Sequence, residues 1–160
     1  MGIEIEKKFK ISKLPTDLDK YDFHIIEQAY LTTNPTIRVR REDDEYYMTY
    51  KGHGEKDSPL AHTEYNLPLT KESYEILKSK ADGHVITKKR VLIPYSPEIG
   101  INHTIELDIF DEPFSPLIIA EVEFNSIEEA NSFIIPNWFT EEVTGQKEYT
   151  NSYLSRKLLA

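Results

Sequence analysis

The chain has 160 residues, of which 39% are hydrophobic and 29% charged, so we expect one domain over residues 1–160 with a sizeable core. Its formal net charge of −9 makes it a poor general binder of nucleic acid or membrane surfaces, and no apolar run approaches the length of a membrane span. It has no cysteine, which excludes disulfides and thiolate metal sites and fits a cytoplasmic protein.

The first predicted element is a strand at residues 4–8, where successive side chains point to opposite faces. Glu4, Glu6 and Lys8 then share one face, with the two carboxylates about 7 Å apart. Such a pair can hold a divalent cation, and a lysine beside it can bind an anion. On this motif alone, an exposed polar strand face is the more frequent explanation.

Further strands follow along the chain. A polar stretch at 12–20 predicts a loop with a short helical turn, the acidic run at 42–45 predicts a hairpin loop, and residues 52–59 predict a flexible loop. Between such turn signals, alternating apolar and polar residues predict strands at 25–31, 36–40, 46–51, 61–67, 85–94, 101–110 and 117–124.

Three segments are expected to be helical. The first begins after Thr70, a good N-cap residue, and stops before the Asp-Gly pair at 82–83. The second opens at Ser126 with capping-box spacing and ends before Pro136. The last is a C-terminal amphipathic segment in which one helical face would carry Tyr153, Leu154 and Leu158. Many short strands with a few helices indicate an α+β fold with an antiparallel sheet or barrel.

Charged residues two positions apart recur on the strands. The pairs are Glu4/Glu6, Arg38/Arg40, Lys88/Arg90, Glu106/Asp108 and Glu121/Glu123, with Lys8, Lys51 and Glu64 as single charges in phase. If these faces line the interior of a barrel, the outer apolar face that helices cover consists of Ile5, Val39, Leu107 and Val122. Such an interior is costly without a ligand, because like charges repel and buried charges lose hydration. Magnesium with a linear triphosphate would satisfy both signs of charge.

Residues 4–8 resemble the ExExK signature of the CYTH superfamily, whose members are also called triphosphate tunnel metalloenzymes. The resemblance extends over nearly the whole chain, through residues 28–31, 37–40, 50–52, 87–90, 105–110, 120–124, 142–145 and 149–151. The chain departs from the family pattern at Ala29, where glycine is common, and at Glu148, where arginine is frequent. His62 and Asn66 stand where acidic residues are frequent, which leaves the number of bound metals open.

The resemblance implies a closed eight-stranded antiparallel β-barrel, or tunnel, with flanking helices. It implies Mg²⁺ or Mn²⁺ as the cofactor, bound by Glu4, Glu6, Glu121 and Glu123. It implies phosphate contacts from Lys8, Arg38, Arg40, Lys51, Lys88 and Arg90. Behind these groups, the carboxylates expected to support the metal ligands are Glu64, Glu106 and Asp108. For Glu106 and Asp108, pairing with the basic residues is an equal alternative.

For catalysis we expect Lys88 to supply a proton or positive charge to the leaving phosphate and Lys8 to stabilise the transferred phosphoryl group. Tyr30 is expected either to orient water or to pack in the core. The leading function is a metal-dependent inorganic triphosphatase that hydrolyses tripolyphosphate to pyrophosphate and phosphate. The alternatives are a class IV-type adenylate cyclase, a thiamine or nucleoside triphosphatase, and a non-catalytic polyphosphate-binding module. The expected partner is a small-molecule triphosphate, without nucleic acid or membrane, and a homodimer stays open.

Overall fold

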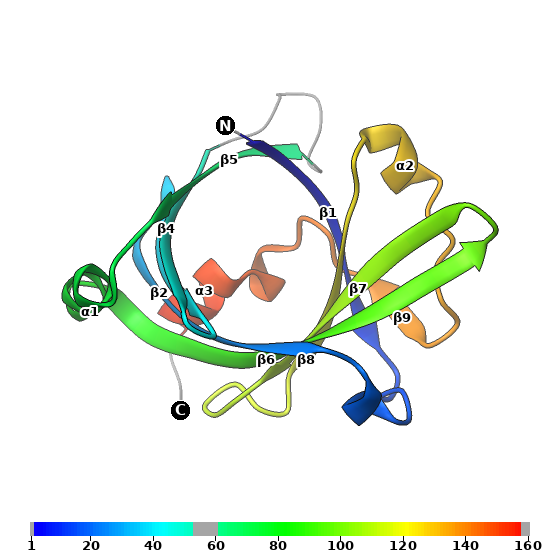
Figure 1. Ribbon diagram of the computed structural model, residues 1–160, viewed down its shortest axis with the longest axis horizontal. Coiled ribbons are helices and arrows are strands. Elements are labelled where there is room, and N and C mark those ends of the chain that lie inside the picture. Colours follow the sequence, from blue (N-terminus) through cyan, green and yellow to red (C-terminus); the bar gives the residue numbers. More distant parts are fainter. Residues whose placement is uncertain (1, 53–60, 158–160) are drawn as a thin grey trace.

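The computed structural model describes residues 2–52 and 61–157. Its strands are β1 (Gly2–Ile11), β2 (Phe23–Thr33), β3 (Thr36–Glu42), β4 (Glu45–Lys51), β5 (Ala61–Pro68), β6 (Asp82–Glu98), β7 (Ile101–Phe110), β8 (Ile118–Glu123) and β9 (Phe139–Glu142). They form one antiparallel sheet in the order β5-β4-β3-β2-β6-β7-β8-β1-β9, and a further pairing of β5 with β1 closes all but β9 into a barrel (Figure 1). The predicted eight-stranded antiparallel barrel is confirmed.

Two features of the sheet differ from the predicted strands. Strand β6 begins at Asp82 and continues to Glu98, well beyond the predicted 85–94, so the turn that follows it is tighter than expected. The short strand β9 is absent from the prediction; it pairs with the second half of β1, outside the closed ring. The predicted loop at 52–59 lies, apart from its first residue, outside the described residues.

The helices are short and confirm the predicted caps. They are η1 (Leu18–Lys20), α1 (Lys71–Ser79), α2 (Ile127–Asn131), η2 (Lys147–Tyr149) and α3 (Asn151–Arg156), where η marks a 3-10 helix. Thr70 Oγ1 accepts a hydrogen bond from Ser73 N at 3.1 Å, and Ser126 Oγ accepts one from Glu129 N at 3.0 Å. No helix in the described part of the chain is long and apolar enough to cross a membrane.

The outer face of the barrel is apolar, as predicted. One cluster there includes Phe9, Leu107 and Val122 and is covered by α2 and the segment after it, with Ile5 packed at its edge. A second cluster packs Ala29, Val39 and Tyr74 beneath α1. Val39, Leu107 and Val122 have no exposed surface. Because side chains alternate along each strand, this outer core directs the charged residues inward.

An inner apolar cluster fills one end of the barrel. It contains Tyr30, Ile86, Phe110, Phe114, Ile119 and Leu154. Ile86 pairs in register with Gln28, and Phe110 with Lys88, so these apolar side chains share the inward face with polar ones. Leu154 belongs to α3, which lies across this end (Figure 1).

The C-terminal helix differs in detail from the predicted amphipathic segment. Leu154 is buried, whereas Tyr153 is 39% exposed, so the two do not share a face, and Leu158 lies outside the described residues. The helix packs closely on the start of β6. Gly83 has a φ of +81°, and a Cβ atom there would lie 2.1 Å from the Ser155 carbonyl oxygen, so only glycine permits this contact.

Candidate active site

A cavity of about 460 Å³ occupies the barrel interior. The strands bring together most of the predicted site residues, which lie far apart in sequence. Those lining the cavity are Glu4, Glu6, Lys8, Tyr30, Arg38, Arg40, Lys51, Glu64, Lys88, Arg90, Glu121 and Glu123. The predicted supporting residues Glu106 and Asp108 do not line it and lie behind Arg90, to which both are hydrogen-bonded.

Three of the four predicted metal ligands converge. Glu4, Glu6 and Glu123 each offer a carboxylate oxygen within 4.8 Å of the others. Burial raises the pKa of Glu6, and repulsion from Glu121 and Glu4 raises it further. Partial burial and the nearby Glu106, Glu4 and Glu6 raise the pKa of Glu123 to about 8. A hard divalent cation would relieve this repulsion, so the oxygen donor set fits Mg²⁺ or Mn²⁺.

The fourth predicted ligand, Glu121, is held by cations. Its Oε1 lies 3.6 Å from Lys8 Nζ, and its Oε2 accepts a hydrogen bond from Arg90 Nη2 at 3.1 Å. Burial alone would raise the pKa of Glu121, but Lys8, Arg90 and Lys88 outweigh it and hold this pKa far below the usual range. Glu121 is therefore an ionised carboxylate between two cations, beside the three converging glutamates.

Arg90 joins three acidic side chains. Its Nε and Nη2 donate to both carboxylate oxygens of Asp108 at 2.7 and 2.9 Å, and its Nη1 donates to Glu106 at 3.0 Å. With the bond to Glu121, every guanidinium nitrogen is used. Burial raises the pKa of Glu106 to about 7 despite this partner. Arg90 thus fixes the acidic strands β7 and β8 against β6.

Lys88 is the most buried cation of the site. Its side chain has no exposed surface, and its Nζ donates to Asp108 at 2.6 Å and to Asn151 Oδ1 at 3.2 Å. Burial lowers the pKa of Lys88 to about 8, because the attraction of Asp108 only partly offsets lost hydration and Arg90 adds repulsion. An ammonium with such a pKa can release a proton near neutral pH.

The two β3 arginines are much less neutralised. Arg38 makes no ion pair with a described carboxylate. Its Nη2 donates to Thr49 at 3.1 Å, and its buried Nε has no hydrogen-bond partner among residues 2–52 and 61–157. Arg40 donates to Gln28 Oε1 at 2.7 Å and lies 3.9 Å from its nearest carboxylate, that of Glu42. These guanidiniums therefore retain charge and donors for an anion in the cavity.

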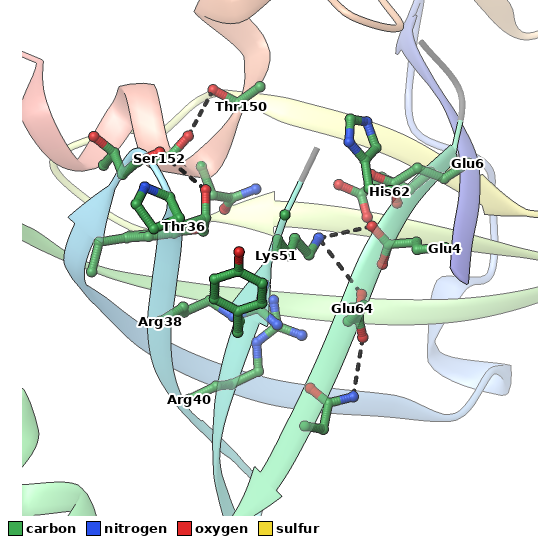
Figure 2. A pocket seen from close by; sticks show the side chains of 18 of the residues that line it. Glu4, Glu6, Thr36, Arg38, Arg40, Lys51, His62, Glu64, Thr150 and Ser152 are labelled. Atoms are coloured by element: carbon green, nitrogen blue, oxygen red, sulfur yellow. Dashed lines mark hydrogen bonds and ion pairs between the residues drawn. The ribbon is translucent and has the colours of Figure 1, made fainter. Parts of the chain in front are cut away.

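Lys51 stands between the cationic and acidic sides. Figure 2 shows its ammonium directed toward Glu4 and Glu64, at 2.8 and 3.9 Å. Asn66, one of the departures from the family pattern, donates to Glu64 at 3.0 Å and accepts from Thr49 at 2.6 Å. Glu64 therefore pairs with a basic residue, and its expected support of the metal ligands stays a prediction.

Gln28 and Asn151 have no role in the sequence analysis beyond their place in the resemblance. Gln28 is fully buried between Arg40 and Asn151. Strand alternation could have identified Gln28, because it lies two residues before Tyr30 and hence on the same strand face. Asn151 begins a helix rather than continuing a strand, so no alternation points to it.

Similarity to known proteins indicates the family to which the chain belongs. No protein-family model matches the chain. It is 37% identical over 158 residues to an inorganic triphosphatase of Nitrosomonas europaea, covering 95% of this chain and 96% of that protein. It is 34% identical over 155 residues to an inorganic triphosphatase of Acetivibrio thermocellus, covering 96% and 94% of the two chains.

Solved structures extend the likeness to the fold. The crystal structure of an inorganic triphosphatase superposes with a TM-score of 0.69 at 32% identity, covering 100% of this chain and 99% of the other. A Pyrococcus horikoshii protein superposes with a TM-score of 0.55 at 20% identity over 80% of this chain and 82% of the other, which shows a shared fold alone. From the identities over nearly full length and the charged barrel interior, the chain belongs to the inorganic triphosphatase family of the CYTH superfamily.

Proposed function

We propose that the protein is a hydrolase that cleaves tripolyphosphate to pyrophosphate and orthophosphate with a divalent cation in its barrel. The observation that carries this proposal is one cavity with carboxylates converging on one side and incompletely neutralised arginines on the other. A metal–triphosphate complex carries both charges that such a cavity complements.

Glu4, Glu6 and Glu123 would hold the cation, with Glu121 beside them. When bound, Mg²⁺ or Mn²⁺ supplies positive charge against phosphate oxygens and makes water more acidic. The other steps rest on protein groups. Arg38 and Arg40 orient the phosphate chain and stabilise the negative charge that spreads over the transferred phosphoryl group.

In the reaction, a water oxygen forms a bond to a terminal phosphorus while the bond from that phosphorus to its bridging oxygen breaks. Pyrophosphate leaves with the bridging oxygen and its electron pair, and the hydrogens of the attacking water leave with the orthophosphate. Lys88 is the group we assign to donate a proton or positive charge to this oxygen, because its buried ammonium lines the cavity. Tyr30 lines the cavity and also packs in the inner apolar cluster, which supports both of its expected roles.

The deciding experiment is product analysis with Mg²⁺ and Mn²⁺ in separate reactions. Tripolyphosphate should yield equimolar orthophosphate and pyrophosphate. Cyclic AMP from ATP would identify a cyclase instead, and faster release of phosphate from thiamine triphosphate or nucleoside triphosphates would identify an organic triphosphatase. Binding without any product would reduce the protein to a polyphosphate-binding module.

A further inference from the structure

We propose that the side-chain amide of Asn151, at the start of α3, is a phosphate-recognition group: its oxygen is held by Lys88 and Gln28, and its nitrogen donates to a terminal phosphate oxygen. This inference rests on the proposed function and names one more contact of that site. It follows from which atoms in the surrounding hydrogen-bond chain can donate and which can accept.

The chain of hydrogen bonds begins at Arg40. A guanidinium can only donate, so the Gln28 atom that receives its hydrogen bond at 2.7 Å must be the carbonyl oxygen. The amide nitrogen of Gln28 is then on the other side of that group, where it donates to Asn151 at 3.0 Å. Gln28 has no exposed surface and does not line the cavity, so no ligand competes for this arrangement.

The orientation of Asn151 is fixed from two directions. The Gln28 nitrogen requires an acceptor, and so does the Lys88 ammonium, which lies 3.2 Å away and can only donate. Both bonds therefore end on Asn151 Oδ1. The Nδ2 group makes no hydrogen bond to residues 2–52 or 61–157, although Asn151 lines the cavity.

The helix places this amide at the edge of the phosphate site. Thr150 caps α3, accepting a hydrogen bond from Tyr153 N at 3.2 Å, so Asn151 is the first residue of the helix. Figure 2 shows Thr150 and Ser152, its two sequence neighbours, across the cavity from Glu4 and Glu6. An uncharged donor here suits a phosphate oxygen next to Lys88, because it adds a hydrogen bond without further cation–cation repulsion.

Two substitutions at Asn151 distinguish phosphate recognition by its nitrogen from the hydrogen bonds that its oxygen accepts from Lys88 and Gln28. Asn151→Ala removes both the acceptor and the donor. Asn151→Asp keeps an acceptor for Lys88 and Gln28 but replaces the donor with a negative oxygen. Arg156→Ala is the matched control on the same helix: Arg156 is exposed and pairs with Asp82 at 3.3 Å, away from the cavity. Melting curves of all variants confirm that they fold.

The probe is the imido analogue of tripolyphosphate with Mg²⁺, whose binding by calorimetry needs no turnover. We expect Asn151→Ala to raise the dissociation constant about tenfold, as for a lost hydrogen bond to a charged group. Asn151→Asp should raise it further, and Arg156→Ala should change it less than twofold. Wild-type affinity in either Asn151 variant, or an equal loss in Arg156→Ala, would overturn the inference.

Failure of the proposed function gives a different result. Wild-type protein that binds the analogue but does not hydrolyse tripolyphosphate rejects the activity, while the Asn151 series still tests recognition. Wild-type protein that hydrolyses tripolyphosphate, with Asn151→Ala binding the analogue equally well, rejects the inference alone. Wild-type protein that binds no analogue rejects both.

Discussion

Arg90 and Asp108 form a bidentate ion pair inside the barrel, with N–O distances of 2.7 and 2.9 Å, and the same carboxylate also accepts from Lys88 at 2.6 Å. One buried carboxylate therefore contacts two buried cations. Burial would raise the pKa of Asp108, but Arg90 and Lys88 outweigh burial and lower it. The side chain of Asp108 is only 1% exposed, so water cannot replace it as a partner.

We expect Asp108→Asn to lower the free energy of unfolding by about 3 kcal/mol or more, because removing one member of a buried ion pair leaves uncompensated charge. Urea unfolding at pH 7 measures this change. Glu141→Gln is the control, since Glu141 pairs with Lys10 on the exposed surface and should contribute less than about 1 kcal/mol. Equal stability of the two variants would contradict the assigned role of Asp108.

The β3 and β6 arginines should respond differently to substitution. Arg38→Gln is expected to weaken tripolyphosphate binding at least about tenfold with little loss of stability, because Arg38 has no ion pair with a described carboxylate to lose. Arg90→Gln should instead destabilise the fold strongly, because three buried or partly buried carboxylates each lose a cationic partner. Calorimetric binding and urea unfolding of both variants test the contrast. The exposed Arg41→Gln, on the same strand as Arg38, is the control and should change neither quantity.

The converging carboxylates predict dependence on a divalent metal. Glu6→Gln and Glu123→Gln should each reduce turnover of tripolyphosphate at least about tenfold and raise the Mg²⁺ concentration needed for half-maximal activity, because each removes a negative oxygen ligand. Activity titrated with Mg²⁺ measures both effects. Unchanged metal dependence in these variants, or full activity in excess chelator, would rule out the metal site.

The metal-free barrel should lose stability as pH rises from about 4.5 to 8. The pKa values of Glu106 and Glu123 are raised from 4.5 in the unfolded chain to about 7 and about 8 in the folded protein. Their contribution to the stability of the fold is therefore complete below pH 4.5, and it is lost as they ionise in the folded state. The lowered pKa of Lys88, about 8, affects stability only at higher pH. There the stability of the fold increases, because Lys88 loses its proton at a lower pH in the folded protein than in the unfolded chain. Melting temperatures in chelator measure the slope. Glu106→Gln should flatten it, and an equal slope in this variant would contradict the assignment.

Strict strand alternation was sufficient to predict most of the strands and their inward charges, whereas the closed eight-stranded barrel followed from the resemblance to the CYTH superfamily. Arg38 and Arg40 face inward since Val39 between them packs in the outer core. The pairing among those charges was not predictable. Arg90 and Arg40 each follow another cation by two residues. Arg90 nevertheless contacts three carboxylates, whereas Arg40 donates to Gln28. That difference depends on which strands are neighbours, β7 for Arg90 and β2 for Arg40.

The residues at the helical end were missed for a related reason. The contact of Asn151 with Lys88 joins positions 63 apart in sequence, and it depends on α3 packing against Gly83. Periodicity within a segment contains no information about such contacts. The inner apolar cluster was likewise not predicted, because it combines Ile86 and Phe110, which lie in phase with charged residues, with Leu154 of α3.

The last prediction concerns the choice of triphosphate. The inward groups are cations and carboxylates matched to phosphates and a metal, and the inner apolar cluster and α3 occupy one end of the barrel. A nucleoside on ATP would protrude from one mouth of the barrel, where it gains few buried hydrogen bonds. We therefore expect kcat/KM for tripolyphosphate to exceed that for ATP at least tenfold, about 1.4 kcal/mol of transition-state discrimination. Steady-state kinetics with both substrates and the same metal measure the ratio. Equal or better use of ATP would show that the mouth recognises the nucleoside.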